Sequence, residues 1–171
     1  MACAPGQEEL VVDQFVSVLH AENRKSWGPR TSETFTSGGL TLALAAQAGV
    51  ECTLTELPLL LSDEAYRRRL LKHVREPLVL DGFWADYNAL TPAEQAARIG
   101  SPLNKIRAFL LRSPLRNMLG VARPRWSIEQ VIAERKILIV PLSAGKIGQS
   151  AAALLGNLLL AKVYMLSLIH I

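Results

Sequence analysis

The sequence predicts an α/β protein that is mostly helical in this chain and has one β-strand near residues 136–143. Two observations lead to this prediction. Ile137 to Val140 form a continuous apolar run rich in branched residues, as in a strand that is covered on both faces. The turn at residues 141–148 contains glycine and precedes a long apolar segment, typical of a helix, that extends to Lys162. One strand and one helix cannot bury each other, so this unit requires partner strands that the remaining sequence does not offer.

The composition indicates an ordinary soluble protein. The chain has 171 residues, of which 50% are hydrophobic and 20% are charged. Cys3 and Cys52 are too few and too far apart for a zinc site or a disulfide framework, so no metal site is expected. Asn157 and Lys162 interrupt the most apolar segment, and no secretory signal is present. We therefore expect a cytoplasmic protein without a transmembrane segment.

The positive charge is concentrated in the middle of the chain. Residues 64–136 contain fourteen lysine and arginine residues against seven aspartate and glutamate residues. Arg67, Arg68, Arg69 and Lys72 lie close together there and are candidate DNA-binding residues, because clustered cations attract a polyanion. The structural alternative is the solvated face of a basic helix.

The N-terminal region predicts two helices. Apolar residues recur at helical spacing over residues 8–22 and form one stripe, so an amphipathic helix is expected there. A second helix is expected to have Thr31 or Ser32 as its N-cap and to end near Ala48. Its middle contains Gly38-Gly39, which lowers the helix propensity.

Capping signals predict the helices that follow. Thr53 to Glu56 and Thr91 to Glu94 each have the S/T-x-x-E spacing of a capping box, and Pro92 suits the first helical position. Further helices are predicted to begin near Ser62, Leu78, Ser113 and Ser127.

The turn from Ser143 to Gly148 is a candidate phosphate-binding turn. Glycine, lysine and free backbone N–H groups at a helix N-terminus can hold a phosphate, which makes Lys146 a candidate nucleotide-binding residue. The spacing nevertheless departs from the phosphate-loop signature G-x-x-x-x-G-K-[ST], and Ile147 stands where a metal-binding hydroxyl is needed. A tight turn without a ligand is the alternative.

Arg30 follows a rigid Trp27-Gly28-Pro29 turn that would hold its guanidinium group in a fixed place. In ring-shaped ATPases an arginine presented to the neighbouring subunit stabilises charge during phosphoryl transfer, so Arg30 is the candidate for an intersubunit arginine. A structural ion pair is the alternative role. The sequence shows no Ser/His/Asp or Cys/His arrangement, so no other catalytic residue is expected. Trp27, Trp84 and Trp126 are expected to be packing residues, and platforms for the stacking of nucleic-acid bases are the alternative.

Several segments together resemble an internal part of the conjugative coupling ATPases of type IV secretion and their HerA-like relatives, which share a RecA-like P-loop motor. The resemblance depends on the order and spacing of these segments, because no single segment is diagnostic. The segments are Trp27 to Arg30, residues 54–61, Tyr66 to Arg69, Phe83-Trp84, Asn104 to Phe109, residues 115–120, residues 136–145, Gly148 and residues 154–156.

The resemblance implies an ATP-driven motor that moves DNA, with Mg²⁺ as its metal and a homo-hexameric ring as its assembly. Secretion-channel proteins are further implied partners, and the inner face of the membrane is the implied location. In this family a Walker A loop precedes such a helical region and a Walker B strand follows it, and this sequence contains neither. We therefore expect the chain to be inactive alone and to bind neither ATP nor Mg²⁺. The alternative function is a small helical nucleic-acid-binding or adaptor protein that uses the basic middle region.

The resemblance also divides the chain into three parts. Residues 1–126 are expected to form a helical subdomain that is inserted in, or attached to, the motor. Residues 127–164 are expected to form a β-α unit of the RecA-like core. Residues 165–171 resemble translated sequencing-adapter read-through and are expected to be a non-native tail.

Overall fold

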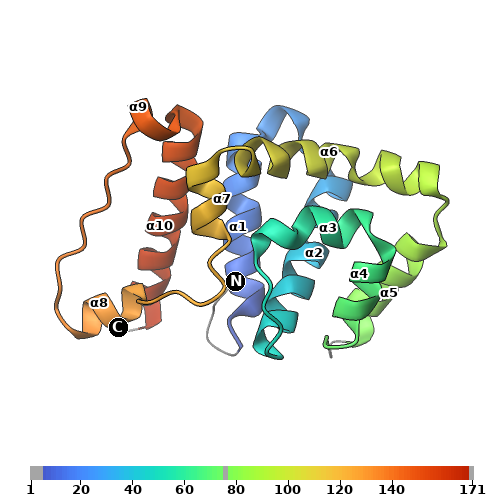
Figure 1. Ribbon diagram of the computed structural model, residues 1–171, viewed down its shortest axis with the longest axis horizontal. Helices are drawn as coiled ribbons and strands as arrows, with labels where there is room; N and C mark the ends of the chain where they lie inside the picture. Colours follow the sequence, from blue (N-terminus) through green and yellow to red (C-terminus); the bar gives the residue numbers. More distant parts are fainter. Residues whose placement is uncertain (1–5, 75–76, 170–171) are drawn as a thin grey trace.

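The computed structural model describes residues 6–74 and 77–169, and every regular element in these ranges is helical (Figure 1). The predicted α/β fold with a RecA-like core is therefore wrong. Residues 136–143 are extended chain without a partner strand, and Ile137 and Ile139 are 90% and 83% exposed. An apolar run becomes a strand only beside another strand, and the described parts of the chain supply none.

Ten α-helices and two 3₁₀ turns make up the described residues. In chain order they are α1 (Glu8–Glu22), η1 (Arg24–Ser26), α2 (Pro29–Gln47), η2 (Leu54–Glu56), α3 (Leu57–Ser62), α4 (Glu64–Leu71), α5 (Pro77–Ala89), α6 (Pro92–Leu110), α7 (Ser113–Leu119), α8 (Ile128–Ala133), α9 (Ala144–Ile147) and α10 (Gln149–Ile169).

Helices α1 and α2 pack together at the centre of the molecule. The predicted apolar stripe of α1 is confirmed, since Val12, Phe15 and Leu19 are buried. Helix α2 starts earlier than expected, with Gly28 as its N-cap, because Pro29 occupies the first helical position, where its fixed φ and missing N–H are tolerated. Thr31 and Ser32 thus lie inside the helix.

The two glycines of α2 allow its close packing. A Cβ atom on Gly38 would lie 2.6 Å from Leu57 Cδ1, and one on Gly39 would lie 3.1 Å from Val12 Cγ1. The pair that seemed to weaken the middle of the helix therefore lies where α2 meets α3 on one side and α1 on the other.

The two predicted capping boxes and the predicted helix start at Ser127 are confirmed. Thr53, Thr91 and Ser127 each form a full capping box, and Asp63 caps α4 by accepting a hydrogen bond from the Tyr66 N–H. Helix α6 continues through Pro102 without a break.

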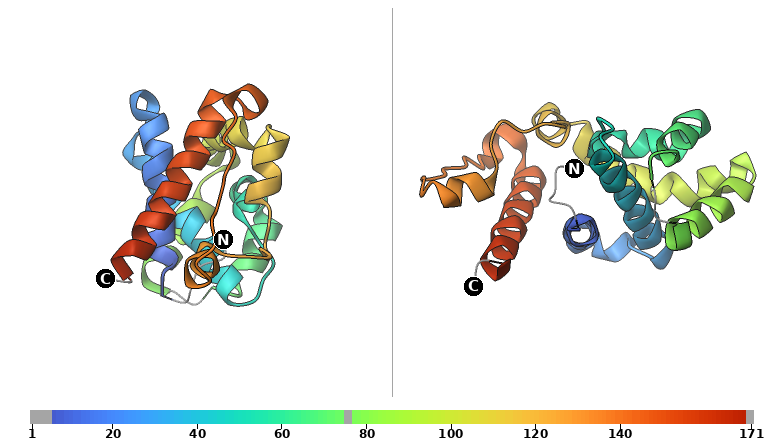
Figure 2. Two further views of the ribbon diagram at one scale, coloured as in Figure 1. Left: turned by 90° about the vertical axis from the view of Figure 1, so that its left-hand side faces the viewer. Right: turned by 90° about the horizontal axis from the view of Figure 1, so that it is seen from below.

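Helix α10 lies beside α1, so the last helix in chain order packs against the first (Figures 1 and 2). Its contact face includes the buried Ala151 and Leu154, and the Gln14 side chain of α1 donates a hydrogen bond to the Ala161 carbonyl over 3.4 Å. The connection through α8 and the extended segment runs along the outside of the molecule (Figure 1). The predicted β-α unit over residues 127–164 is also wrong, because residues 136–143 form no strand and the segment contains only the helices α8, α9 and α10. The helical subdomain over residues 1–126 and the non-native tail remain predictions. Residues 165–169 of that tail continue α10.

Candidate functional site

Arg67, the first member of the predicted DNA-binding cluster, lies in the interior, where only 2% of it is exposed. Its Nη1 donates to the carbonyl oxygens of Leu60 and Leu61 over 3.2 and 3.3 Å. Its Nε donates to Asn88 Oδ1 over 2.9 Å. The guanidinium thus joins α4 to the end of α3 and to α5, and it is not presented to a polyanion.

Two aromatic rings of α5 complete the surroundings of Arg67. The guanidinium carbon lies 4.9 Å from the centroid of Tyr87 and 5.7 Å from that of Trp84, distances typical of cation–π contacts. The Tyr87 hydroxyl donates to the Leu61 carbonyl, and Trp84 Nε1 donates to Thr41 Oγ1 of α2. Burial lowers the pKa of Arg67 and raises that of Tyr87. Arg67, Trp84 and Tyr87 thus form a buried cluster whose hydrogen bonds join α2, α3, α4 and α5.

The other three predicted residues form an exposed surface on α4, which we call the α4 basic face: Arg68, Arg69 and Lys72. Arg68 makes an ion pair with Glu64 one turn earlier, and Arg69 lies over the Tyr66 ring at 5.3 Å. Both partners are local, and such exposed contacts are weak, so a phosphate can replace them.

Aromatic stacking holds the turn that precedes Arg30. The Trp27 ring stacks on Phe35 with centroids 5.4 Å apart and a tilt of 8°, and His20 lies on Trp27 at 5.5 Å. Phe35 in turn meets Phe15 edge to face at 6.1 Å. Helices α1 and α2 therefore clamp the predicted turn, and the backbone that carries Arg30 is anchored in the core.

Arg30 is the second residue of α2, and its side chain is exposed. Among the described residues it makes no ion pair, so the structural alternative considered for this arginine is not found there. A cation in the first turn of a helix faces the positive end of the helix dipole, which is unfavourable by roughly 0.3–1 kcal/mol. Arg30 therefore does not stabilise the start of α2.

Arg30 lines a cleft of about 500 Å³ between α2 and α6, which we call the Arg30–Arg98 cleft. Its lining residues are Arg30, Thr31, Glu33, Leu90, Glu94, Ala97, Arg98 and Ser101. Arg98 Nη2 donates to Glu33 Oε2 over 2.8 Å, and its guanidinium lies over Phe83 at 5.1 Å. The buried Arg98 Nε has no hydrogen-bond partner among the described residues.

The carboxylates of the cleft already have partners. Glu33 is held by Arg98, and Glu94 accepts hydrogen bonds from the side chain and the backbone of Thr91, which lower the pKa of Glu94. Arg30 is thus the cation of the cleft without an ionic partner in the described residues. Sequence reasoning missed Arg98, because its place beside Arg30 arises only from the packing of α6 on α2.

Lys146 lies in the four-residue helix α9, and its side chain is exposed. The predicted strand-to-helix turn is a helix-to-helix turn at Gly148, where φ is +85°. Arg112 fills this turn and donates from Nη1 to the Ile147 carbonyl over 2.8 Å; a Cβ atom on Gly148 would lie 2.1 Å from that nitrogen. A guanidinium therefore occupies the concave side of the predicted phosphate turn.

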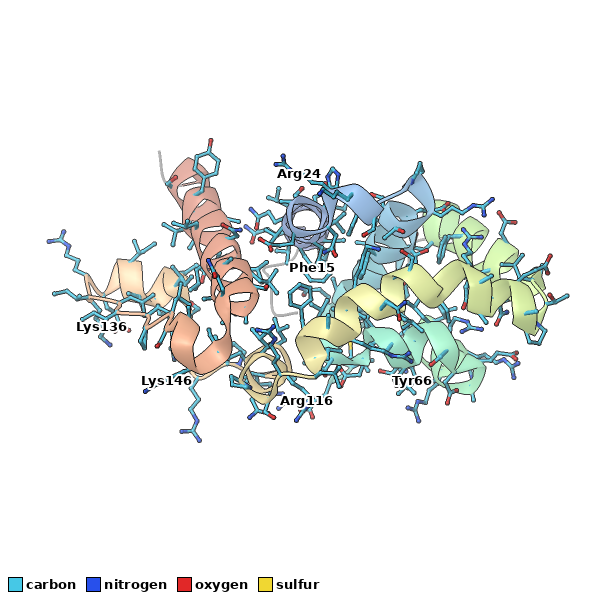
Figure 3. All side chains as sticks on the ribbon, turned by 90° about the horizontal axis from the view of Figure 1, so that it is seen from above. Phe15, Arg24, Tyr66, Arg116, Lys136 and Lys146 are labelled. Carbon is cyan, nitrogen blue, oxygen red and sulfur yellow. The ribbon has the colours of Figure 1, made fainter. Side chains whose placement is uncertain are left out.

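The predicted residues do not meet in one place. Figure 3 shows Lys146 and Tyr66, which marks the α4 basic face, on either side of Arg116 of α7. In the described ranges, His, Cys, Asp and Glu side chains form no group that could hold a metal ion, and no helix is both long and apolar enough to cross a bilayer.

Comparison of the chain with protein-family models, with curated proteins and with solved structures finds no match in any of the three. The resemblance to coupling ATPases therefore remains a prediction from the sequence segments.

Proposed function

We propose that this chain is the helical part of an ATP-driven DNA-translocating motor of the conjugative coupling type and is inactive alone. The observation that carries the proposal is Arg30, which is exposed at the Arg30–Arg98 cleft without an ion pair among the described residues. In the proposed assembly this arginine reaches the nucleotide of the neighbouring subunit. The intact motor supplies the ATP and Mg²⁺ site.

The surroundings of Arg30 suit an arginine that stabilises the charge of a phosphoryl group during its transfer. Transition-state stabilisation requires a guanidinium whose position is set before the reaction, and the Trp27–Phe35 stack anchors its backbone. The planar, always charged guanidinium matches phosphoryl oxygens. The negative charge of a bound phosphate would also relieve the unfavourable position of a cation at the start of α2.

The genomic sequence on both sides of the coding region tests the family assignment directly. We expect a Walker A loop upstream and a Walker B strand downstream in the same reading frame. A start signal immediately before the first codon and a stop codon directly after residue 171 would contradict the assignment.

Substitution of Arg30 in the assembled motor tests the role of the cleft. Arg30→Ala should lower kcat for ATP hydrolysis by about 10³-fold or more, because an intersubunit arginine contributes that much to phosphoryl transfer. Arg30→Lys should recover little of this loss, since an ammonium lacks the bidentate fork. Arg24→Ala is the matched control, because Arg24 is also exposed and lies in η1, the 3₁₀ turn between α1 and α2 (Figure 3). Equal activity of Arg30→Ala and Arg24→Ala would exclude the role.

The second candidate function is a self-contained helical nucleic-acid-binding protein or adaptor, and the α4 basic face favours it. In that case the isolated chain should bind duplex DNA with an affinity that falls steeply with salt.

The triple change Arg68→Glu, Arg69→Glu and Lys72→Glu should reduce the slope of log K against log[salt] by about 3, which corresponds to three lost phosphate contacts. A control triple of exposed residues away from this face, Arg24→Glu, Lys25→Glu and Arg135→Glu, should change the slope less. Tight, salt-sensitive binding by the isolated chain would favour this function over the motor.

A further inference from the structure

An apolar groove lies between the segment that joins α7 to α8 and the face of α10, and we call it the Trp126 groove. Its volume is about 600 Å³, within the usual range of about 300–1,000 Å³ for binding pockets. The residues that line it are Met118, Val121, Arg123, Pro124, Arg125, Trp126, Ser127, Ile128, Glu129 and Lys162.

The apolar side chains of this groove are incompletely covered. Trp126, Met118 and Val121 are each about half exposed, at 52%, 51% and 49%. The packing role expected of the three tryptophans holds for Trp84, which is buried in the core, and for Trp27, which packs against the core, but it is wrong for Trp126. Neighbouring exposed tryptophan and methionine side chains are typical of surfaces that bind another protein.

Cations surround this apolar floor. Arg123, Arg125 and Lys162 line the groove against a single carboxylate, Glu129. Lys162 Nζ and Glu129 Oε1 pair over 2.6 Å and join α8 to α10. Burial alone would raise the pKa of Glu129, but hydrogen bonds from Lys162 and its other donors lower it overall, so this carboxylate stays charged and paired.

The two arginines remain available to a ligand. Arg125 has no ionic or hydrogen-bond partner among the described residues. Arg123 pairs with Glu51 over 2.8 Å, but the two side chains are 81% and 65% exposed, so the pair is weak. The groove therefore combines an uncovered apolar floor with net positive charge.

We propose that the Trp126 groove binds an acidic amphipathic helix of a partner protein. Apolar side chains of that helix would lie on Trp126, Met118 and Val121, and its carboxylates would meet Arg123 and Arg125. A single-stranded nucleic acid fits less well, because its bases need several aromatic platforms and this floor is aliphatic apart from Trp126. This inference is independent of the proposed motor function.

A designed peptide tests the groove in the full chain. The probe is a fluorescein-labelled helix with leucine at positions i, i+3, i+4 and i+7 and glutamate on its other face. Fluorescence anisotropy should show saturable binding, which Trp126→Ala weakens about tenfold or more, as expected of a central aromatic contact. Because Trp126 is half exposed, this change should leave the circular dichroism spectrum and the unfolding midpoint unchanged.

Charge reversal separates this site from general attraction to a basic protein. Arg125→Glu should weaken binding of the glutamate peptide and strengthen binding of the same peptide with lysine in place of glutamate. Arg24→Glu, a change of equal charge at an exposed arginine outside the groove, is the control and should have a smaller effect.

Failure of the glutamate peptide to bind, or equal binding by wild type and Trp126→Ala, would overturn the proposal. Tighter binding of single-stranded oligothymidylate that is lost in Trp126→Ala would also overturn it, in favour of a nucleic-acid surface.

Discussion

Arg67 shows how the same side chain can support opposite predictions until its neighbours are known. It belongs to a run of three arginines in the sequence, yet its two neighbours face solvent while it is buried against Trp84 and Tyr87. A buried guanidinium is stable only when its N–H groups have acceptors, and carbonyls at the end of α3 and Asn88 supply them. A basic cluster in the sequence thus divides into one structural and several surface residues.

Arg67→Ala should destabilise the fold by about 3 kcal/mol, because it removes a large buried side chain and leaves carbonyl groups without donors. Urea unfolding followed by circular dichroism measures this change. Arg68→Ala is the matched control and should lie within about 0.5 kcal/mol of wild type, since Arg68 is exposed. Equal destabilisation by the two changes would contradict the central role of Arg67.

At the scale of elements, the crossing of α2 with α1 and α3 depends on two missing Cβ atoms. Helix propensity alone favours alanine over glycine by up to about 1 kcal/mol. Packing opposes this preference at Gly38, because its neighbour Leu57 is fully buried and has little room to move. The sign of a glycine-to-alanine change therefore depends on where the helix packs.

Gly38→Ala should destabilise the protein by about 1 to 2 kcal/mol, since overpacking exceeds the gain in propensity. Gly100→Ala in α6 should stabilise it by about 0.5–1 kcal/mol, because no atom beyond the adjacent residues and the backbone of α6 itself lies within 4 Å of the added Cβ. Chemical denaturation of both variants gives the comparison. Stabilisation by Gly38→Ala would show that α2 and α3 are less closely packed than described.

The capping box of α6 should make stability depend on pH. The pKa of Glu94 is lowered from 4.5 by its hydrogen bonds with Thr91, so its contribution is fully present above that value and is lost as the pH falls through the lower folded-state pKa. Glu94→Gln removes the titrating group. The melting temperature of wild type should exceed that of Glu94→Gln at about pH 7, and the difference should shrink towards about pH 3. A difference that is unchanged at low pH would assign the effect to packing.

At the scale of the whole molecule, the apolar surface is unevenly distributed. The helices from α1 to α6 enclose most of the buried side chains, whereas the segment from α8 to α10 leaves many apolar side chains exposed. Ile137, Ile139, Leu160 and Tyr164 are each more than 60% exposed. Such a surface favours association with another protein or self-association.

Lysine substitutions test whether residues 136–143 pack against anything. The double variant Ile137→Lys and Ile139→Lys should keep the unfolding midpoint of wild type and show less self-association by sedimentation velocity, because both side chains are exposed. Ile106→Lys, at a buried position, should prevent folding. A large loss of stability in the double variant would mean that this segment is covered in the folded protein.

The helix boundaries were the most predictable part of the fold, for a local reason. A capping box needs only residues three apart, so Thr53, Thr91 and Ser127 determine their helix starts without help from the rest of the chain. The start of α2 was missed because two local signals competed, and Pro29 prevailed over the hydroxyl residues after it. Of the candidate site, the rigid turn before Arg30 was predictable, but its neighbour Arg98 was not.

The sequence by itself determined where most helices begin, the stripe that α1 buries, and the anchored turn that carries Arg30, because each depends on residues close together in the chain. The tertiary structure alone decided that residues 136–143 form no strand, that Arg67 is buried, and that Arg98 lies beside Arg30. The physical reason is that burial and strand pairing depend on partners distant in sequence. An apolar run, an arginine or a tryptophan has the same local pattern whether or not such a partner is present.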